Sequence, residues 1–211
     1  MSSFEILDYI GVALFAATGA LSASRKELDI VGFIFLASAA GIGGGTVRDL
    51  ILGVPIFWIE NSIYLWVCSG TALFIYFAAP FVESRYKVLL WLDAIALAAY
   101  SIFGTQKGML LTGSETISIV MGVFTGVLGG IIRDILARER SILLKREIYV
   151  AASAAGACVF LGLQGLGFIS VVSALAGFIC VLIIRGGTIM FGWRLPAYRS
   201  SPGRDPEEIM K

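Results

Sequence analysis

The sequence predicts an all-α integral membrane protein with seven transmembrane helices, built as two inverted three-helix repeats plus a seventh helix. Two observations support this fold class. Of the 211 residues, 58% are hydrophobic and only 15% are charged, and the apolar residues form runs long enough to cross the hydrocarbon layer of a bilayer. The chain also resembles itself at a constant offset, which indicates an internal duplication.

Seven apolar runs follow one another along the chain, each about as long as one transmembrane helix. They occupy residues 5–23, 28–52, 62–82, 88–105, 115–137, 147–165 and 168–191. The connections are residues 24–27, 60–61, 83–87, 106–107 and 138–147, and the last two runs meet at Gln164-Gly165 without a charge. No connection is long enough for a soluble domain, so we expect residues 1–192 to form a single transmembrane domain. Residues 193–211, with prolines and mixed charges, predict a flexible cytoplasmic tail.

Lysines and arginines are distributed unevenly over alternate connections. With the N-terminus outside, fourteen of the 16 fall on the cytoplasmic side, and only Arg48 and Lys107 remain outside. Because positive residues are retained in cytoplasmic loops, we expect a multi-pass protein of the cell inner (plasma) membrane. Its N-terminus is expected outside and its C-terminus in the cytoplasm, as an odd number of helices requires.

Two related motifs mark the duplication. Residues 41–49 read GIGGGTVRD and residues 126–134 read GVLGGIIRD, 85 positions later (134 − 49 = 85). At the same offset Asp8 falls on Asp93 and Tyr64 on Tyr149. Residues 4–84 and 89–169 are therefore interpreted as two copies of one unit, with the seventh helix at about 168–191 left over. Since three helices end on the opposite side of the membrane from their start, the second copy is expected to be inverted, as in proteins that move solutes.

The glycines of these motifs lie inside apolar runs, where glycine costs helix stability, and two uses for them are open. In the first, the helices break at the glycines and release carbonyl groups, and those of Gly43, Gly44 and Gly129 become candidate ligands of a monovalent cation. In the second, small residues four positions apart let two helices pack closely. The candidate pore or hinge residues are Gly43, Gly44, Gly45, Thr46, Gly129 and Gly130.

Charged residues accompany both motifs and the first helix of each unit. The candidates near a path are Arg48, Asp49, Arg133, Asp134, Asp8 and Asp93. Because an unpaired charge at membrane depth is costly, we expect Asp8 to face Arg48 or its neighbourhood, and Asp93 to face Arg133. These pairs either are purely structural or line a permeation path. For Tyr64 and Tyr149 an interfacial aromatic belt is a sufficient explanation, and a hydroxyl pointing into a pore is the alternative.

The composition argues against several other functions. The chain has no histidine, and its three cysteines stand alone within apolar runs, so we expect no cofactor and no resident metal. The glycine run lacks the following Gly-Lys-Ser/Thr of a phosphate-binding loop, and no nucleophile has a base beside it, so an enzyme is not expected. A net charge of +1 provides no basic field for nucleic acid.

With these motifs in view, the sequence resembles the prokaryotic members of the trimeric intracellular cation channel family. The resemblance rests on the two three-helix units, the seventh helix, and the Gly-Gly-Gly-x-x-Arg-Asp motif of the second helix with its partner in the fifth. It covers about residues 4–190. The second motif departs from the first at Leu128, which stands in place of a glycine, so the fifth helix is expected to bend less. The same bacterial family also carries the label of a glycine transporter.

The resemblance implies a homotrimer in which each protomer has its own pore, lined by the second and fifth helices kinked at the glycines. Such a pore conducts monovalent cations, chiefly potassium, and membrane lipids are the other expected partners. The alternative is a secondary transporter of a small solute such as glycine. The hydroxyls available near the midplane for that purpose are those of Ser38, Thr46, Ser118 and Thr125.

Overall fold

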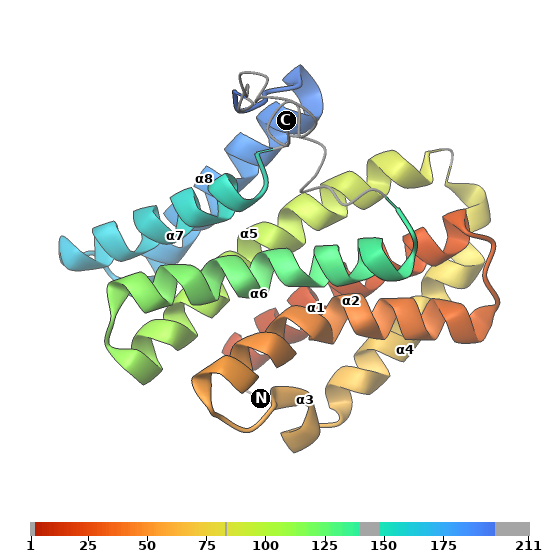
Figure 1. Cartoon of the computed structure of the whole chain (residues 1–211), viewed down its shortest axis with the longest axis horizontal. Helices are drawn as coiled ribbons and strands as arrows, with labels where there is room; N and C mark the ends of the chain where they lie inside the picture. Colours follow the sequence, from red (N-terminus) through yellow and green to blue (C-terminus); the bar gives the residue numbers. More distant parts are fainter. Residues whose placement is uncertain (1–2, 83, 140–147, 197–211) are drawn as a thin grey trace, which may run out of the picture.

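The computed structural model describes residues 3–82, 84–139 and 148–196, with side chains from residue 8 onward. Over these residues the chain folds into helices joined by short connections (Figure 1). The helices are α1 (Ser3–Arg25), α2 (Ile30–Leu52), α3 (Phe57–Glu60), α4 (Ile63–Ala78), the 3-10 helix η1 (Ala79–Phe81), α5 (Arg85–Thr112), α6 (Glu115–Leu136), α7 (Val150–Gly165) and α8 (Ser170–Phe191). The predicted tail at 193–211 lies outside the described residues except for its first four.

Five helical segments are long and apolar enough to cross a membrane: α2, α4 together with η1, α5, α6 and α8. The helix α7 is also apolar but has only 16 residues. The predicted all-α membrane class is therefore confirmed. The apolar runs predicted at 28–52, 115–137 and 168–191 agree with α2, α6 and α8 to within two residues at each end.

The helix α5 differs from its prediction. The apolar run was expected to end before Gln106-Lys107, whereas the helix continues to Thr112 and ends at Gly113, whose φ of 64° is left-handed. The Lys107 ammonium can stay on the helix because its Nζ lies 2.8 Å from Oδ1 of Asp49. The helix therefore continues past the position of the expected polar connection, because Lys107 forms an ion pair with the buried Asp49 of α2.

Two groups of helices form the molecule, and clusters of buried apolar residues lie within and between them. The first cluster lies among α1, α2 and α4 and includes Ala96 and Tyr100 of α5, and two further clusters lie among α5, α6, α7 and α8. The two groups meet mainly where α2 packs along α6 and where α1 packs along α5. Figure 1 shows α2 and α6 side by side near the centre of the molecule. The two glycine motifs are therefore brought to one interface.

One close helix contact occurs in both groups at the repeat offset of 85 (104 − 19 = 121 − 36 = 85). A methyl group placed on Gly19 of α1 would collide with the backbone carbonyl of Leu36 on α2. Likewise, a methyl group on Gly104 of α5 would lie 2.7 Å from the carbonyl oxygen of Met121 on α6. The packing of α1 on α2 is thus repeated by α5 on α6.

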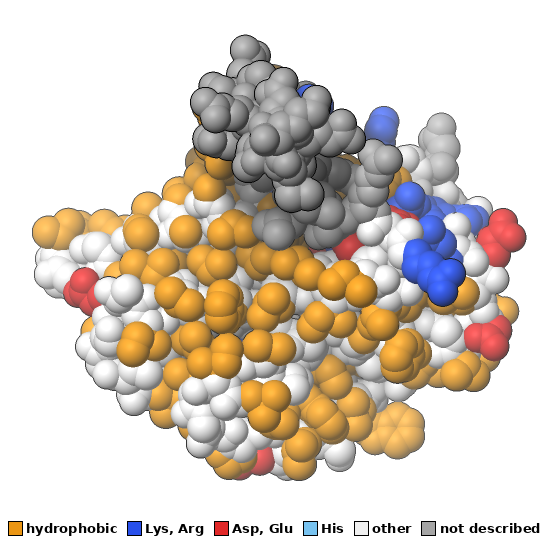
Figure 2. Space-filling view, in the orientation of Figure 1, with side chains coloured by type: hydrophobic (Ala, Val, Ile, Leu, Met, Phe, Trp, Pro, Cys, Tyr) orange, Lys and Arg blue, Asp and Glu red, His pale blue; other side chains and the backbone are white. Residues whose placement is uncertain are grey.

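The exterior is apolar over most of the face shown in Figure 2, where the lysine and arginine side chains gather toward one side. Trp66 and Phe74 on α4 are 75% and 70% exposed, and Ile183 on α8 is 61% exposed. An exposed apolar surface of this extent would be unfavourable in water. It fits a protein whose surroundings are the hydrocarbon of a bilayer.

Candidate functional site

The helices α2 and α6 touch backbone to backbone at the glycine motifs. A methyl group on Gly44 would collide with the carbonyl oxygen of Thr125 and lie 3.3 Å from the backbone nitrogen of Gly129. A methyl group on Gly129 would lie 2.7 Å from the carbonyl oxygen of Ala40. These glycines are required because no side chain fits where the two helices cross. We call this contact, made by Ala40, Gly44, Thr125 and Gly129, the glycine crossing.

The glycine crossing is antiparallel and reciprocal. Advancing from Ala40 to Gly44 along α2 moves the partner on α6 backward, from Gly129 to Thr125. The residues also exchange at the repeat offset, because 40 + 85 = 125 and 44 + 85 = 129. Each copy therefore presents the same glycine to the same carbonyl of the other copy, as in a contact across a two-fold axis.

Of the two uses left open for the glycines, a break in the helices does not occur. Both α2 and α6 run as uninterrupted α-helices through their motifs, so the carbonyls of Gly43, Gly44 and Gly129 lie within the helical hydrogen-bond pattern. They are not released as they would be by a break. Close packing, the other interpretation of the glycines, explains the structure.

The other candidate residues of the motifs also have close neighbours. A methyl group on Gly43 would lie 2.8 Å from Cδ1 of Ile132, and one on Gly45 would lie 2.6 Å from the ring of Phe57. The Thr46 hydroxyl donates to the carbonyl of Ile42 at 2.7 Å. In turn it accepts a hydrogen bond from the indole nitrogen of Trp58 at 2.8 Å. The first motif is thus covered by α3 as well as by α6.

A first group of charges lies at the end of α2 and consists of Arg48, Asp49 and Lys107, which we call the α2 charge cluster. Oδ1 of Asp49 accepts from Nε of Arg48 at 2.7 Å and from Nζ of Lys107 at 2.8 Å. Its Oδ2 accepts from the backbone N–H of Phe57 at 3.1 Å. The Asp49 side chain is fully buried, whereas that of Lys107 is 33% exposed. Two cations and three hydrogen bonds compensate the burial of one carboxylate.

A second group lies at the end of α6 and consists of Arg133, Asp93 and Asp134, the α6 charge cluster. The Arg133 guanidinium donates from Nη1 to Asp93 at 2.8 Å and from Nη2 to Asp134 at 2.8 Å. Arg133 and Asp93 are completely buried, and the side chain of Asp134 is 5% exposed. The Tyr149 hydroxyl and Asp93 both border the position of Gly130, where a methyl group would lie 2.7 Å and 3.3 Å from them. Arg185 of α8 stacks on the Tyr149 ring at 4.9 Å.

Of the two predicted pairs, Asp93 with Arg133 is confirmed. Asp8 lies only in the neighbourhood of Arg48, because Tyr64, which binds Asp8, and Arg48 both contact the Phe57 ring, at 4.7 Å and 5.8 Å. The Asp8 carboxylate instead accepts hydrogen bonds from the hydroxyls of Tyr64 at 2.5 Å and Tyr100 at 2.9 Å. Arg48 turns to the adjacent Asp49, as described for the α2 charge cluster. Tyr100 makes the difference, because the matching position of the first copy (100 − 85 = 15) is a phenylalanine, which offers no hydroxyl to Asp93.

The belt interpretation of Tyr64 and Tyr149 is also wrong. The two tyrosines are only 7% and 1% exposed and lie beside Asp8 and Asp93 in the interior. The sequence indicated this position beside the aspartates, because Tyr64 follows Asp8 and Tyr149 follows Asp93 by the same 56 residues (64 − 8 = 149 − 93 = 56). Sequence reasoning also missed Lys107 and Arg185, and for each the signal was a single charge within a long apolar helix.

Comparison with known proteins places this arrangement in a family. The sequence model of a family described as "Glycine transporter" matches the chain twice, at residues 5–80 and 90–165. The crystal structure of the TRIC trimeric intracellular cation channel orthologue from Rhodobacter sphaeroides is 41% identical in sequence, with a TM-score of 0.88 over 92% of this chain and 100% of that chain. This chain belongs to the TRIC family, as a prokaryotic member.

Further relatives of this TRIC protein agree. Another solved TRIC cation channel is 28% identical, with a TM-score of 0.83 over 96% of this chain and 100% of that chain. The "UPF0126 membrane protein" of Vibrio cholerae is 39% identical over 207 residues, 93% of this chain and 83% of that protein. The "UPF0126 inner membrane protein YadS" of Escherichia coli K12 is 33% identical over 198 residues, 91% of this chain and 94% of that protein.

In this TRIC protein the two charge clusters lie on opposite sides of the glycine crossing. Arg48 and Arg133 each follow the crossing glycine of their own helix by four residues, about 6 Å at 1.5 Å per residue. Because the helices run antiparallel, these steps lead in opposite directions. The arrangement places buried carboxylates near two ends of one helix pair, with a close-packed contact between them.

Proposed function

We propose that the protein is a cation channel with a path for monovalent cations in each protomer, along α2 and α6. The TRIC proteins of known structure to which it is 41% and 28% identical are described as cation channels. The observation that carries the proposal is the glycine crossing with a charge cluster on either side. Preference for potassium is part of the proposal and is supported by the family resemblance.

The proposed architecture has seven membrane spans, α1, α2, α4, α5, α6, α7 and α8, in two inverted repeats with α8 outside them. The family model supports the duplication, because its two matches begin 85 residues apart (90 − 5 = 85). The antiparallel, reciprocal contact of α2 with α6 supports the inversion. With the N-terminus outside, the α2 charge cluster faces outward and the α6 charge cluster faces the cytoplasm.

In the proposed mechanism the glycine crossing is the gate. The contact of α2 with α6 leaves no space for an ion between their backbones, so conduction requires the two helices to separate there. The α6 charge cluster, in which Asp93 and Asp134 outnumber Arg133, is the end that favours cations over anions. The neighbouring Arg48, Lys107 and Arg133 hold the carboxylates of both clusters in place.

The channel is further proposed to assemble as a homotrimer in the bacterial inner membrane. The Rhodobacter sphaeroides relative is described as a trimeric channel, and the Escherichia coli relative is described as an inner membrane protein. Each protomer contains both helices of its own glycine crossing. A path in every protomer therefore needs no residue from a second copy.

Glycine transport is the second candidate, favoured by the description of the matching family model. Three of the four hydroxyls that could hold the solute are engaged by their own helices: Thr46 donates to Ile42, Ser118 to Ser114 and Thr125 to Met121, at 2.6 to 2.7 Å. Their donors are therefore not available to a substrate carboxylate in this conformation. This observation favours the channel.

Current through the purified protein in a planar bilayer tests the proposal, first under a potassium gradient and then under a sodium gradient. Discrete openings that reverse near the potassium equilibrium potential are expected. Absence of current, together with uptake of radiolabelled glycine by vesicles containing the same preparation, would establish the transporter instead.

A further inference from the structure

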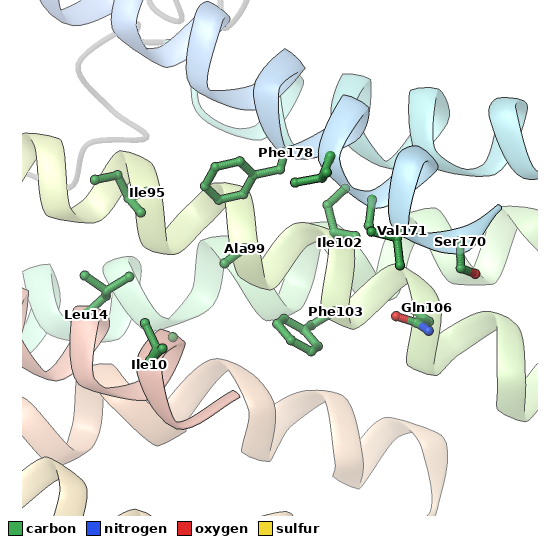
Figure 3. A pocket seen from close by; sticks show the side chains of 13 residues that line it. Ile10, Leu14, Ile95, Ala99, Ile102, Phe103, Gln106, Ser170, Val171 and Phe178 are labelled. Carbon is green, nitrogen blue, oxygen red and sulfur yellow. The ribbon is translucent and has the colours of Figure 1, made fainter. Parts of the chain in front are cut away.

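A groove of about 350 Å³ lies between α1, α5 and α8, on a part of the molecule that the glycine crossing does not use. Figure 3 shows isoleucine, leucine, valine and phenylalanine side chains along most of its length. Ile10, Val171 and Leu175 at its rim are 51%, 60% and 56% exposed. The groove is therefore open to the surroundings of the protein rather than closed within it.

One end of this groove is polar. Gln106 of α5 and Ser170 at the start of α8 lie there together, and Figure 3 shows their nitrogen and oxygen atoms at that end only. The Ser170 hydroxyl oxygen accepts from Nε2 of Gln164 at 2.7 Å, so its own hydrogen is available for donation. The Gln106 side chain makes no hydrogen bond to any residue that the structure describes. Both groups can donate to an acceptor at the mouth of an apolar groove.

The surroundings of the groove are hydrocarbon. Both α5 and α8 are long and apolar enough to span a membrane, and water does not fill an apolar groove at that depth.

We propose that this groove binds one acyl chain of a glycerophospholipid, with the ester carbonyl oxygen of that chain accepting hydrogen bonds from Gln106 and Ser170. A phospholipid places an ester acceptor directly at the end of an apolar chain, which is the order of groups in the groove. Apolar side chains of a second protomer would leave both donors unsatisfied, which is unfavourable. The site is independent of the proposed function, because a transporter of this fold would carry it as well.

The first test uses the unaltered full-length protein in detergent and a matched pair of lipids. Phosphatidylglycerol with ester-linked chains is titrated in native mass spectrometry against the ether-linked analogue, which lacks only the two carbonyl oxygens. We expect one tightly bound ester lipid per protomer and about 30-fold weaker binding of the ether lipid, the value of two hydrogen bonds at about 1 kcal/mol each. Equal binding of the two lipids, or no lipid that survives dilution, would overturn the proposal.

Variants locate the site. Ala174→Phe places a ring in the groove, and Ala151→Phe on α7 is the matched control, because Ala151 is exposed and does not line the groove. The tight lipid should be lost from Ala174→Phe and retained by Ala151→Phe, with the same number of protomers in both assemblies. Gln106→Leu should retain the lipid but reduce the preference for the ester form. Full retention of lipid by Ala174→Phe would refute the site, and so would dissociation of its protomers, which would assign the groove to a second copy.

Discussion

Replacement of Gly129 by alanine adds one methyl group at the glycine crossing. That methyl group would lie 2.7 Å from the carbonyl oxygen of Ala40, whereas ordinary contacts of such atoms begin at 3.4 Å. The two helices must therefore separate by about 0.7 Å (3.4 − 2.7). Because both partners are backbone atoms of long helices, no side-chain rotation can relieve the contact.

The stability change follows from two opposing effects. Overpacking of this kind costs about 1 to 3 kcal/mol, and alanine in place of glycine in a helix returns about 1 kcal/mol. The net loss for Gly129→Ala is thus about 0 to 2 kcal/mol. Gly70→Ala is the matched control, because Gly70 lies in α4 with nothing within 4 Å of the added methyl group. It should gain about 1 kcal/mol.

Thermal unfolding in detergent, followed by tryptophan fluorescence, compares the two variants directly. Gly129→Ala should have the lower midpoint and Gly70→Ala a midpoint at or above that of the unaltered protein. In planar bilayers, Gly129→Ala should also spend more time open, because the closed contact can no longer form fully. Equal shifts of the two midpoints would refute the close packing, and an unchanged open probability would remove the crossing from the gate.

Three further predictions concern the charges. Lys107→Met removes one of the two cations from the buried α2 carboxylate and should cost about 1 to 3 kcal/mol, measured by thermal unfolding, with Lys107→Arg restoring most of the loss. Asp93→Asn breaks a fully buried pair and should cost about 3 to 5 kcal/mol, whereas Asp8→Asn, with neutral tyrosine partners, should cost about 1 kcal/mol; similar losses in a denaturation series would contradict the assigned partners. Arg25→Ala removes the ion pair with Glu139, whose side chains are 31% and 14% exposed, and should cost less than about 1 kcal/mol; a larger loss that persists in high salt would contradict this surface role.

The repeat in the sequence predicted more of the site than composition did. A shared offset related Asp8 to Asp93 and Tyr64 to Tyr149, and each aspartate does lie beside the tyrosine of its own copy. The same offset relates the two glycines that meet at the crossing. Residues that recur in register were informative because a duplicated unit folds the same way twice.

The errors arose where a residue type allows more than one environment. Consecutive glycines permit both a break and a close contact, and the choice depends on a second helix that lies more than 80 residues away in the chain. A lysine in an apolar stretch indicates either a connection or a buried ion pair. For Lys107 the decision depends on Asp49, which only the packing of α2 against α5 brings within 2.8 Å.

The departures from the repeat determine how the two ends of the helix pair differ. Lys107 corresponds to Ser22 in the first copy (107 − 85 = 22), so only Asp49 receives a second cation. Tyr100 corresponds to Phe15 (100 − 85 = 15), so only Asp8 receives a second hydroxyl, and Asp93 pairs with Arg133. The three residues of the α2 charge cluster therefore sum to +1, and those of the α6 charge cluster to −1. Matching motifs position the two clusters, and the residues that do not match give them opposite charge.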